Sequence, residues 1–291
     1  MRTPHGRLLA LAGLATLMAA ATLRGWQARE SPPETVFFDD FAGPDLDRSK
    51  WNVIVTGRTV NNEQQAYVDA RDTIDFVRGA DADGASNGAL ALRPRFRAGF
   101  KTPEGRAFDF ISGRLESRGK VEFTFGSVSA RIKLTAGQGL WPAFWTLGAG
   151  RWPDTGEMDI MENVGERDWT NVALHGPGYS GNTPLVMRRP FTPSNDITQW
   201  HEYSMDWTTD GFVFKVDGEP FYTVTRAMVE KYGRWAYDNP KFLIVNFALG
   251  GQYPQSVNHA MTPYPGLPDS TVELIKADKV RMLVDWVRVT K

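Results

Sequence analysis

The sequence GEMDIMEN at 156–163 places three carboxylates, Glu157, Asp159 and Glu162, in a run that otherwise has the composition of a buried strand. In a regular strand, alternate residues share a face of the sheet. Glu157 and Asp159 obey this rule, but Glu162 falls on the opposite parity. A regular strand therefore cannot present all three side chains to the same side.

A β-bulge at Ile160 or Met161 would resolve the parity, because a bulge inserts one extra residue and returns the next side chain to the earlier face. All three carboxylates would then share one face of the sheet. Bulges are also frequent beside active sites. The spacing therefore predicts a bulged strand that carries a row of three aligned carboxylates.

Such a row suits the cleavage of a glycosidic bond. Glu157 and Glu162 would be about 13 Å apart along the backbone at ~3.3 Å per residue. Side chains that lean together could bring their carboxyls to the ~5–5.5 Å of a retaining glycosidase. Asp159 between them would repel both charges and raise their pKa values. One carboxyl could then stay protonated as an acid while another attacks as a nucleophile.

The spacing alone leaves two other interpretations open. The three acids could form a solvated face, although the apolar residues Met158, Ile160 and Met161 between them indicate that one face is buried. They could also hold a hard cation. The sequence has no His/Cys cluster with metal-ligand spacing, no G-x-S-x-G elbow and no GxxxxGK[ST] phosphate loop.

The composition is that of one large domain with a substantial core. The chain has 291 residues, a net charge of −1 and no cysteine, and a core of that size needs no disulfide. The near-neutral charge argues against a nucleic-acid partner, which usually requires a basic face. Ten tryptophans can be core residues, and they also suit flat ligands such as sugar rings.

The first residues have the pattern of a secretory signal peptide: a basic segment at 1–7, a small and apolar one at 8–23, and then polar residues. Ala19 and Ala21 offer a small-residue cleavage site. The apolar run is shorter than the about 20 residues of a membrane span, so an uncleaved anchor is the less favoured alternative. We predict a signal peptide over 1–21, a linker over 22–35 and one domain over 36–291. The mature protein is then secreted or periplasmic and outside the membrane.

Short apolar alternations separated by turn residues dominate the rest of the chain, and we find no repeat. Asp210-Gly211 and Asp217-Gly218 each lie between apolar runs, which is a strong hairpin signal. The best helix candidate is short, at 226–232. The pattern predicts an all-β protein, an antiparallel sandwich or jelly roll. Its clearest strand-rich segments are 120–134, 201–224, 242–251 and 279–291.

Aromatic residues and one histidine surround the acidic run in the sequence. Trp141, Trp145 and Trp152 precede it, and Trp141 and Trp145 share a face if their segment is a strand. His175 follows at what reads as a strand end before a Gly/Pro loop. The alternative is structural in both cases, with the tryptophans in the core and the histidine in a packing role.

Three quoted blocks together carry a family resemblance: GLWPAFWTLG, GEMDIMENVG and LHGPGYSG. With VFFDDFAGPDLDRSKW at 36–51 and NNEQQAY at 61–67, the sequence strongly resembles glycoside hydrolase family 16, in its laminarinase-like branch. The resemblance spans nearly the whole predicted mature chain. It implies a concanavalin-like β-jelly roll, a sandwich of two antiparallel sheets with an open concave substrate cleft.

The resemblance also implies roles for the site residues. Glu157 matches the nucleophile, Glu162 the acid/base, and Asp159 the assisting acid. Substrate-binding positions are implied at Trp141 and Trp145, which line sugar subsites, at His175 near the leaving group, and at Asn62, Glu63 and Arg114 on the glycon side. No organic cofactor is implied.

A structural calcium ion is a further implication, because many members of the family bind one on the convex face. The matching positions are Asp40, the carbonyl of Gly43, and Asp285. Oxygen ligands of this kind suit calcium. Two acids alone usually mark surface charge, so the ligand set stays an expectation from the resemblance.

The expected function is that of a secreted, retaining and monomeric endo-β-1,3-glucanase whose partner is a polysaccharide. Alternatives are cleavage of mixed-linkage β-1,3-1,4-glucan or a marine galactan, a transglycosylase, or a non-catalytic glucan-binding lectin. The segments 78–88 and 250–279 are expected to be loops near the cleft ends, and Tyr253 stands where the family commonly has tryptophan. RPRFR at 93–97 and MRR at 187–189 are candidate contacts to a sulfated substrate, although each is more typical of a solvated strand or loop.

Overall fold

The computed structural model describes residues 33–291, so the predicted signal peptide and most of the predicted linker lie outside the described residues. The folded domain begins slightly before the predicted boundary at 36. Strand β1 starts at Thr35, and the backbone groups of Glu34 exchange two hydrogen bonds with Lys291 at 2.8 and 2.9 Å. The last residues of the predicted linker are therefore part of the domain.

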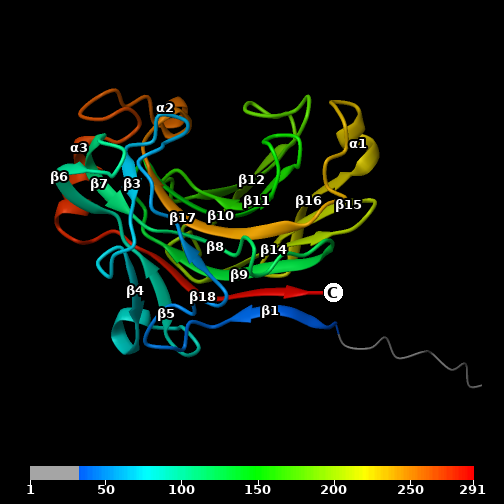
Figure 1. Cartoon of the computed structure of the whole chain (residues 1–291), viewed down its shortest axis with the longest axis horizontal. Helices are drawn as coiled ribbons and strands as arrows, with labels where there is room; N and C mark the ends of the chain where they lie inside the picture. The colour runs from blue at the N-terminus through cyan, green and yellow to red at the C-terminus, as the bar shows by residue number, and fades with distance from the viewer. Residues whose placement is uncertain (1–32) are drawn as a thin grey trace, which may run out of the picture. The chain divides into compact units, whose positions relative to one another are not determined.

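Two large antiparallel sheets are stacked as layers (Figure 1). The eight-stranded sheet has the order β16-β15-β14-β9-β18-β5-β4, with β1 paired to β18. Its strands are β1 (Thr35–Asp39), β4 (Ile74–Val77), β5 (Ala89–Leu92), β9 (Gly126–Leu134), β14 (His201–Trp207), β15 (Gly211–Val216), β16 (Glu219–Thr225) and β18 (Met282–Thr290).

The seven-stranded sheet has the order β13-β12-β11-β10-β17-β8-β2, and the acidic run forms its strand β11. Its strands are β2 (Asn52–Val53), β8 (Arg114–Glu116), β10 (Leu140–Gly148), β11 (Glu157–Glu162), β12 (Trp169–His175), β13 (Val186–Pro190) and β17 (Lys241–Leu249). The predicted all-β jelly-roll sandwich is confirmed.

A third, small sheet departs from the expected pair of antiparallel sheets. It consists of β3 (Gln65–Tyr67), β6 (Arg95–Lys101) and β7 (Ala107–Ser112), and β3 pairs with β7 in parallel. Parallel neighbours need a long connection, and the chain between β3 and β7 supplies one through β4, β5 and β6. The basic stretch at 93–97 enters β6, whose side chains are mostly exposed.

The helices are few, and two of them lie where loops are expected. Helix α1 (Arg226–Glu230) agrees with the predicted short helix, but the segment 250–279 folds into α2 (Gln252–Asn258) and α3 (Asp269–Lys276). A 3₁₀ turn, η1, covers Gly79–Ala82. The buried spacing of Val272 and Ile275 is helical, and it went unrecognised because eight residues give little periodicity. Within residues 33–291 no helix has the length and hydropathy of a membrane span.

The segment 78–88 does not lie near the acidic run. The backbone N–H and the hydroxyl of Ser86 donate to Asp285 at 2.8 and 3.1 Å, and Asp285 belongs to β18 of the eight-stranded sheet. The expectation of a loop at a cleft end is therefore wrong for this segment. The contact joins residues 199 positions apart, so the local sequence contains no signal for it.

The core fills the space between the two large sheets, as the alternation in β9 predicts. Val128, Ala130, Ile132 and Leu134 are at most 4% exposed, and they pack in one cluster with Phe144 of the other large sheet. Each large apolar side chain buried this way contributes about 1.5–3 kcal/mol. The second predicted hairpin is confirmed too, since Asp217 and Gly218 both have positive φ and join β15 to β16, as a two-residue turn requires.

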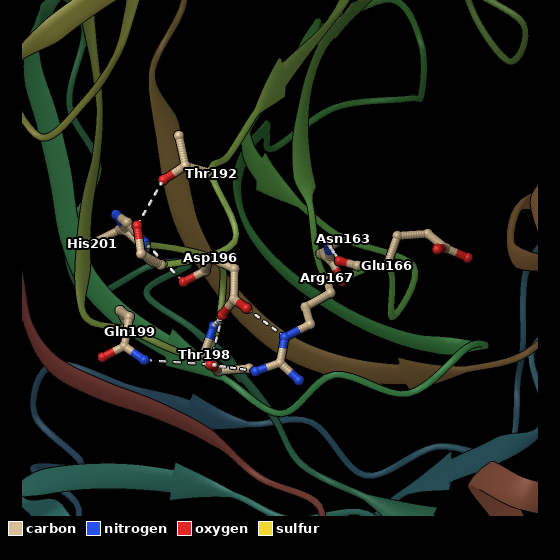
Figure 2. Close-up of polar contacts among 9 residues, drawn as sticks. Asn163, Glu166, Arg167, Thr192, Asp196, Thr198, Gln199 and His201 are labelled. Carbon is tan, nitrogen blue, oxygen red and sulfur yellow. Dashed lines mark hydrogen bonds and ion pairs between the residues drawn. The ribbon is translucent and has the colours of Figure 1, made fainter.

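The side chain of Asn163, which is fully buried, stabilises the connection after β11 by hydrogen bonds. Its amide donates to the carbonyls of Glu166 and Trp169 at 2.8 and 2.6 Å, and its oxygen accepts from the N–H of Gly165 at 2.7 Å. Figure 2 shows Arg167 at the end of this connection, paired with Asp196. The chain that follows Glu162 is thus fixed at both ends.

The same connection docks on the chain that leads into β10. The N–H groups of Gly137 and Gly139 donate to the carbonyls of Gly165 and Val164, both at 3.0 Å. Gly165 has φ +86°, and a Cβ at this position would lie 1.8 Å from the Gly137 carbonyl oxygen. Only glycine therefore permits this approach, which positions the start of β10 beside the end of β11.

Gly165→Ala tests this close approach. We expect it to lower the free energy of unfolding by clearly more than the about 1–2 kcal/mol of left-handed strain alone, because the backbones must separate. Gly119→Ala is the matched control, since Gly119 has φ +70° and open space around its Cβ position. Urea denaturation of both variants is the measurement. Equal losses of stability would contradict the account.

Candidate active site

The predicted bulge lies at residues 160–161 of β11. Asp159 pairs with Ala173 of β12 and Glu162 pairs with Asn171, so two residues of β11 face the single residue between them. Ile160 and Met161 are 1% and 0% exposed and belong to the core. Glu157, Asp159 and Glu162 consequently share the opposite face of the seven-stranded sheet, which we call the acidic face.

Two neighbours contact Glu157 and Asp159 on the acidic face. The indole N–H of Trp152 donates to Glu157 Oε2 at 2.8 Å. His175, directly opposite Glu157 on β12, places Nε2 3.1 Å from Asp159 Oδ2 and 3.9 Å from Glu157 Oε1. These contacts bring His175 together with the first two acids, and its predicted place near the leaving group stays a prediction.

Glu162 has its own pair of donors. The indole N–H of Trp141 donates to Oε1 at 2.9 Å, and the amide of Asn171 donates to Oε2 at 3.2 Å. Both oxygens are therefore occupied, and the carboxyl is held in one orientation. Trp141 thus lies beside the acids, and its predicted role in a sugar subsite stays a prediction. Asn171 was missed, and a lone amide in the apolar run NVALH is the signal that could have found it.

Burial is the largest influence on the pKa values of the three acids. It raises the pKa of Glu157 to about 8, and the charge of Asp159 adds to the rise. Burial and the charge of Glu162 hold the pKa of Asp159 well above its usual range. Burial raises the pKa of Glu162 as well, while the hydrogen bond from Trp141 opposes the rise. The three carboxyls therefore share fewer than three charges at neutral pH.

A second cluster of polar and aromatic side chains lies on the neighbouring strands β10, β17 and β8. The indole N–H of Trp145 donates to Asn246 Oδ1 at 2.7 Å, and the guanidinium of Arg114 lies 5.0 Å from the Trp145 ring centroid. Arg114 also donates to Glu116 at 2.6 and 3.0 Å. The structure thus brings Trp145 and Arg114 together, and their predicted roles in binding sugar stay predictions. Asn246 and Glu116 were missed, although an amide inside the apolar run FLIVNFALGG is a visible signal.

The other two predicted glycon-side residues differ in their surroundings. Glu63 is 7% exposed and accepts from the amide of Gln65 at 2.8 Å. Burial raises the pKa of Glu63 to about 7, and the nearby charges of Arg114 and Glu162 act on it in opposite directions. Asn62 is exposed in a turn, with φ +57°. The structure places Glu63 with the acidic face and shows no side-chain hydrogen bond for Asn62 among the described residues.

An aromatic wall stands beside Glu162. The Tyr253 ring of α2 meets Trp141 edge-on with centroids 5.5 Å apart, and Trp169 of β12 packs in the same cluster. Arg188 of β13 lies over the Trp169 ring, 4.1 Å from its centroid. Tyr253 therefore occupies the wall where the family commonly has tryptophan, and it does so from a helix that the sequence did not predict.

The only described group of three potential metal-binding side chains in residues 33–291 is Glu157, Asp159 and His175, whose ligand atoms lie within 4.8 Å of one another. At the predicted calcium position, Arg78 Nη2 donates to the Gly43 carbonyl at 2.9 Å, and the Asn87 amide donates to Asp40 Oδ2 at 2.9 Å. Nitrogen donors thus occupy oxygens that calcium would need.

The third predicted calcium ligand, Asp285, is fully buried and already paired. Arg131 Nη1 lies 2.5 Å from its Oδ2, and Ser86 binds both carboxylate oxygens. A guanidinium therefore supplies the positive charge that a cation would supply. Together with the contacts of Asp40 and Gly43, this arrangement does not fit a calcium site.

Comparison with known proteins adds independent findings. The sequence signature of glycosyl hydrolases family 16 matches residues 51–262. A beta-glucanase of Rhodothermus marinus is 30% identical over 253 residues, which cover 82% of this chain and 84% of that protein. A keratan-sulfate endo-1,4-beta-galactosidase of Sphingobacterium multivorum is 27% identical, over 89% of this chain and 55% of that protein.

A solved structure extends the likeness to the fold. The endo-beta-1,3-glucanase of Pyrococcus furiosus superimposes with a TM-score of 0.75 at 31% identity, over 89% of this chain and 94% of that one. The family signature covers well over half of the chain, includes the bulged strand and ends beyond the aromatic wall. The chain belongs to glycosyl hydrolases family 16.

Proposed function

We propose that the protein is a retaining endo-β-1,3-glucanase that cleaves laminarin-type glucan by double displacement. The observation that carries the proposal is the position of Glu157 and Glu162 on one face of a bulged strand, each held by an indole N–H. Relatives named as beta-glucanase and endo-beta-1,3-glucanase support the substrate class.

Glu157 is the proposed nucleophile and attacks the anomeric carbon to form a glycosyl-enzyme. The hydrogen bond from Trp152 orients its carboxylate and favours the ionised form. As the carboxylate becomes an ester, it gives up its charge, which relieves its repulsion with Asp159. Asp159 is thus the assisting acid, with His175 against it.

Glu162 is the proposed acid/base. Its raised pKa keeps a proton available for the departing sugar oxygen. After the sugar leaves, the same carboxylate accepts a proton from the water that releases the product. Trp141 and Asn171 hold it in place for both steps. No cofactor takes part in this chemistry.

The remaining interpretations share these acids and differ in substrate or acceptor. A relative named as a keratan-sulfate endo-1,4-beta-galactosidase makes a galactan the second candidate substrate. Mixed-linkage glucan and transglycosylation use the same three carboxylates. A lectin without activity is disfavoured, because both glutamates are present and oriented. The signal-peptide pattern at 1–21 supports the further proposal that the protein is secreted or periplasmic. We also propose that it is a monomer.

A substrate panel tests the proposal. Reducing-sugar release is measured on laminarin, curdlan, lichenan, agarose and carrageenan, with Glu157→Gln as the blank. We expect cleavage of the β-1,3-glucans and a loss on the order of 10⁴ or more in the variant, because the nucleophile is removed. Cleavage of agarose or carrageenan alone would contradict the proposed substrate, and full activity of Glu157→Gln would contradict the mechanism.

Asp159→Asn should move the acidic limb of the kcat/KM profile. Removing this negative charge lowers the pKa of Glu157, so Glu157 is ionised at lower pH and the limb shifts to lower pH. Asp168→Asn, in the exposed connection after β11, is the control and should leave the limb unchanged. A shift to higher pH in Asp159→Asn would show that Asp159 does not repel the nucleophile.

Metal removal should not affect stability. Because Arg78, Asn87 and Arg131 occupy the oxygens of the predicted calcium ligands, EDTA is expected to leave the Tm unchanged. Arg131→Met should destabilise the fold by about 3 kcal/mol, since it leaves the buried Asp285 charge unpaired. A Tm that falls with EDTA and recovers with calcium would restore the calcium expectation.

A further inference from the structure

Arg188 occupies a position on the acidic face that the proposed mechanism does not use. Directly paired residues of antiparallel strands point to the same side of a sheet. Glu162 pairs with Asn171, and Asn171 pairs with Arg188. The Asn171 amide reaches Glu162, so Arg188 projects from the same face, about 10 Å away at ~4.8 Å per strand.

The guanidinium of Arg188 is held by stacking. It lies 4.1 Å from the centroid of Trp169, and Trp169 precedes Asn171 by two residues on β12, which places it on the same face. Such a contact restricts the side chain, while Arg188 itself is exposed at edge strand β13. The charge is therefore fixed in direction and open to solvent.

The charge of Arg188 has no carboxylate partner in residues 33–291, unlike that of Arg114 across the acidic face. Arg114 is paired with Glu116 at 2.6 Å, so its charge is already balanced within the protein. When a guanidinium stacks on an aromatic ring, its N–H groups still point outward in the guanidinium plane, and two of them can bind two oxygens of one oxyanion. A neutral sugar hydroxyl would use only one donor and would gain nothing from the charge.

We propose that Arg188, held against Trp169, binds an anionic substituent of the polysaccharide, on a sugar located on the β12–β13 side of Glu162. This inference rests on the proposed function, because it assumes that a glycan chain lies along the acidic face. The substituent is an oxyanion, either a sulfate ester or a carboxylate. The protein is thus a hydrolase that accepts chains modified with negative charge, and Arg188 determines that specificity.

The test compares neutral laminarin, partially sulfated laminarin and carboxymethylated laminarin as substrates of the full-length protein. Arg188→Gln should lower the ratio of kcat/KM on an anionic chain to kcat/KM on the neutral chain by about tenfold, which is the scale of a lost charge-assisted contact. The loss should appear in KM, with kcat nearly unchanged. Arg188→Lys, which keeps the charge without the planar fork, should lose part of the ratio.

The matched control is Arg288→Gln. Arg288 is also exposed and stacked on a tryptophan, 4.8 Å from the Trp286 centroid, but it lies on β18 of the other large sheet. Its removal should leave the ratio unchanged. High salt should reduce the wild-type preference for anionic chains, because it screens an exposed charge.

The possible outcomes distinguish a failure of the Arg188 inference from a failure of the proposed function. A ratio that falls only with sulfated laminarin assigns a sulfate ester, and one that also falls with the carboxymethylated chain assigns oxyanions in general. An unchanged ratio in Arg188→Gln overturns the inference. If the wild type cleaves none of the three chains, the proposed function fails instead. Calorimetric binding of the same chains to wild type and Arg188→Gln then decides the inference, and equal affinities overturn it.

Discussion

One extra residue in β11 is the constraint on which the rest of the site depends. Without the bulge at Ile160 and Met161, the parity of the strand would turn Glu162 into the core beside Met158, where an ionised carboxylate has no partner. With it, both apolar residues enter the core and Glu162 joins the other acids. The glycine-dependent docking after Asn163 then fixes the end of this strand against the beginning of β10.

Burying three carboxylates side by side costs free energy, and the hydrogen-bond donors around them determine how much of that cost is offset. Burial raises all three pKa values, and repulsion from a neighbouring carboxylate adds to the rise at Glu157 and Asp159. The indole N–H groups of Trp152 and Trp141 offset part of this cost at the two glutamates without adding a titratable charge. Trp141 is 8% exposed and shields Glu162 from solvent, whereas Trp152 is 46% exposed and shields Glu157 less.

The local sequence pattern predicted the features that depend on residues close together in the chain. The parity of GEMDIMEN predicted the bulge, the alternation in 128–134 predicted a core strand, and Asp217-Gly218 predicted a hairpin. The pattern did not predict long-range contacts. The sequence contains no signal that 78–88 binds Asp285, or that a helix at 252–258 brings Tyr253 to Trp141. The calcium expectation came from resemblance, and Arg78 and Arg131 occupy the ligand oxygens. The roles of the site residues remain proposals that the geometry supports.

The division of labour between Glu157 and Glu162 is the central claim, and trapping the covalent intermediate tests it most directly. The protein is incubated with a 2-deoxy-2-fluoro laminarin-type glycoside that carries an activated leaving group, digested with protease, and analysed by mass spectrometry. The account predicts a single glycosyl ester on Glu157. An ester on Asp159 or Glu162, or turnover of the native substrate that inverts the anomeric configuration, would contradict it.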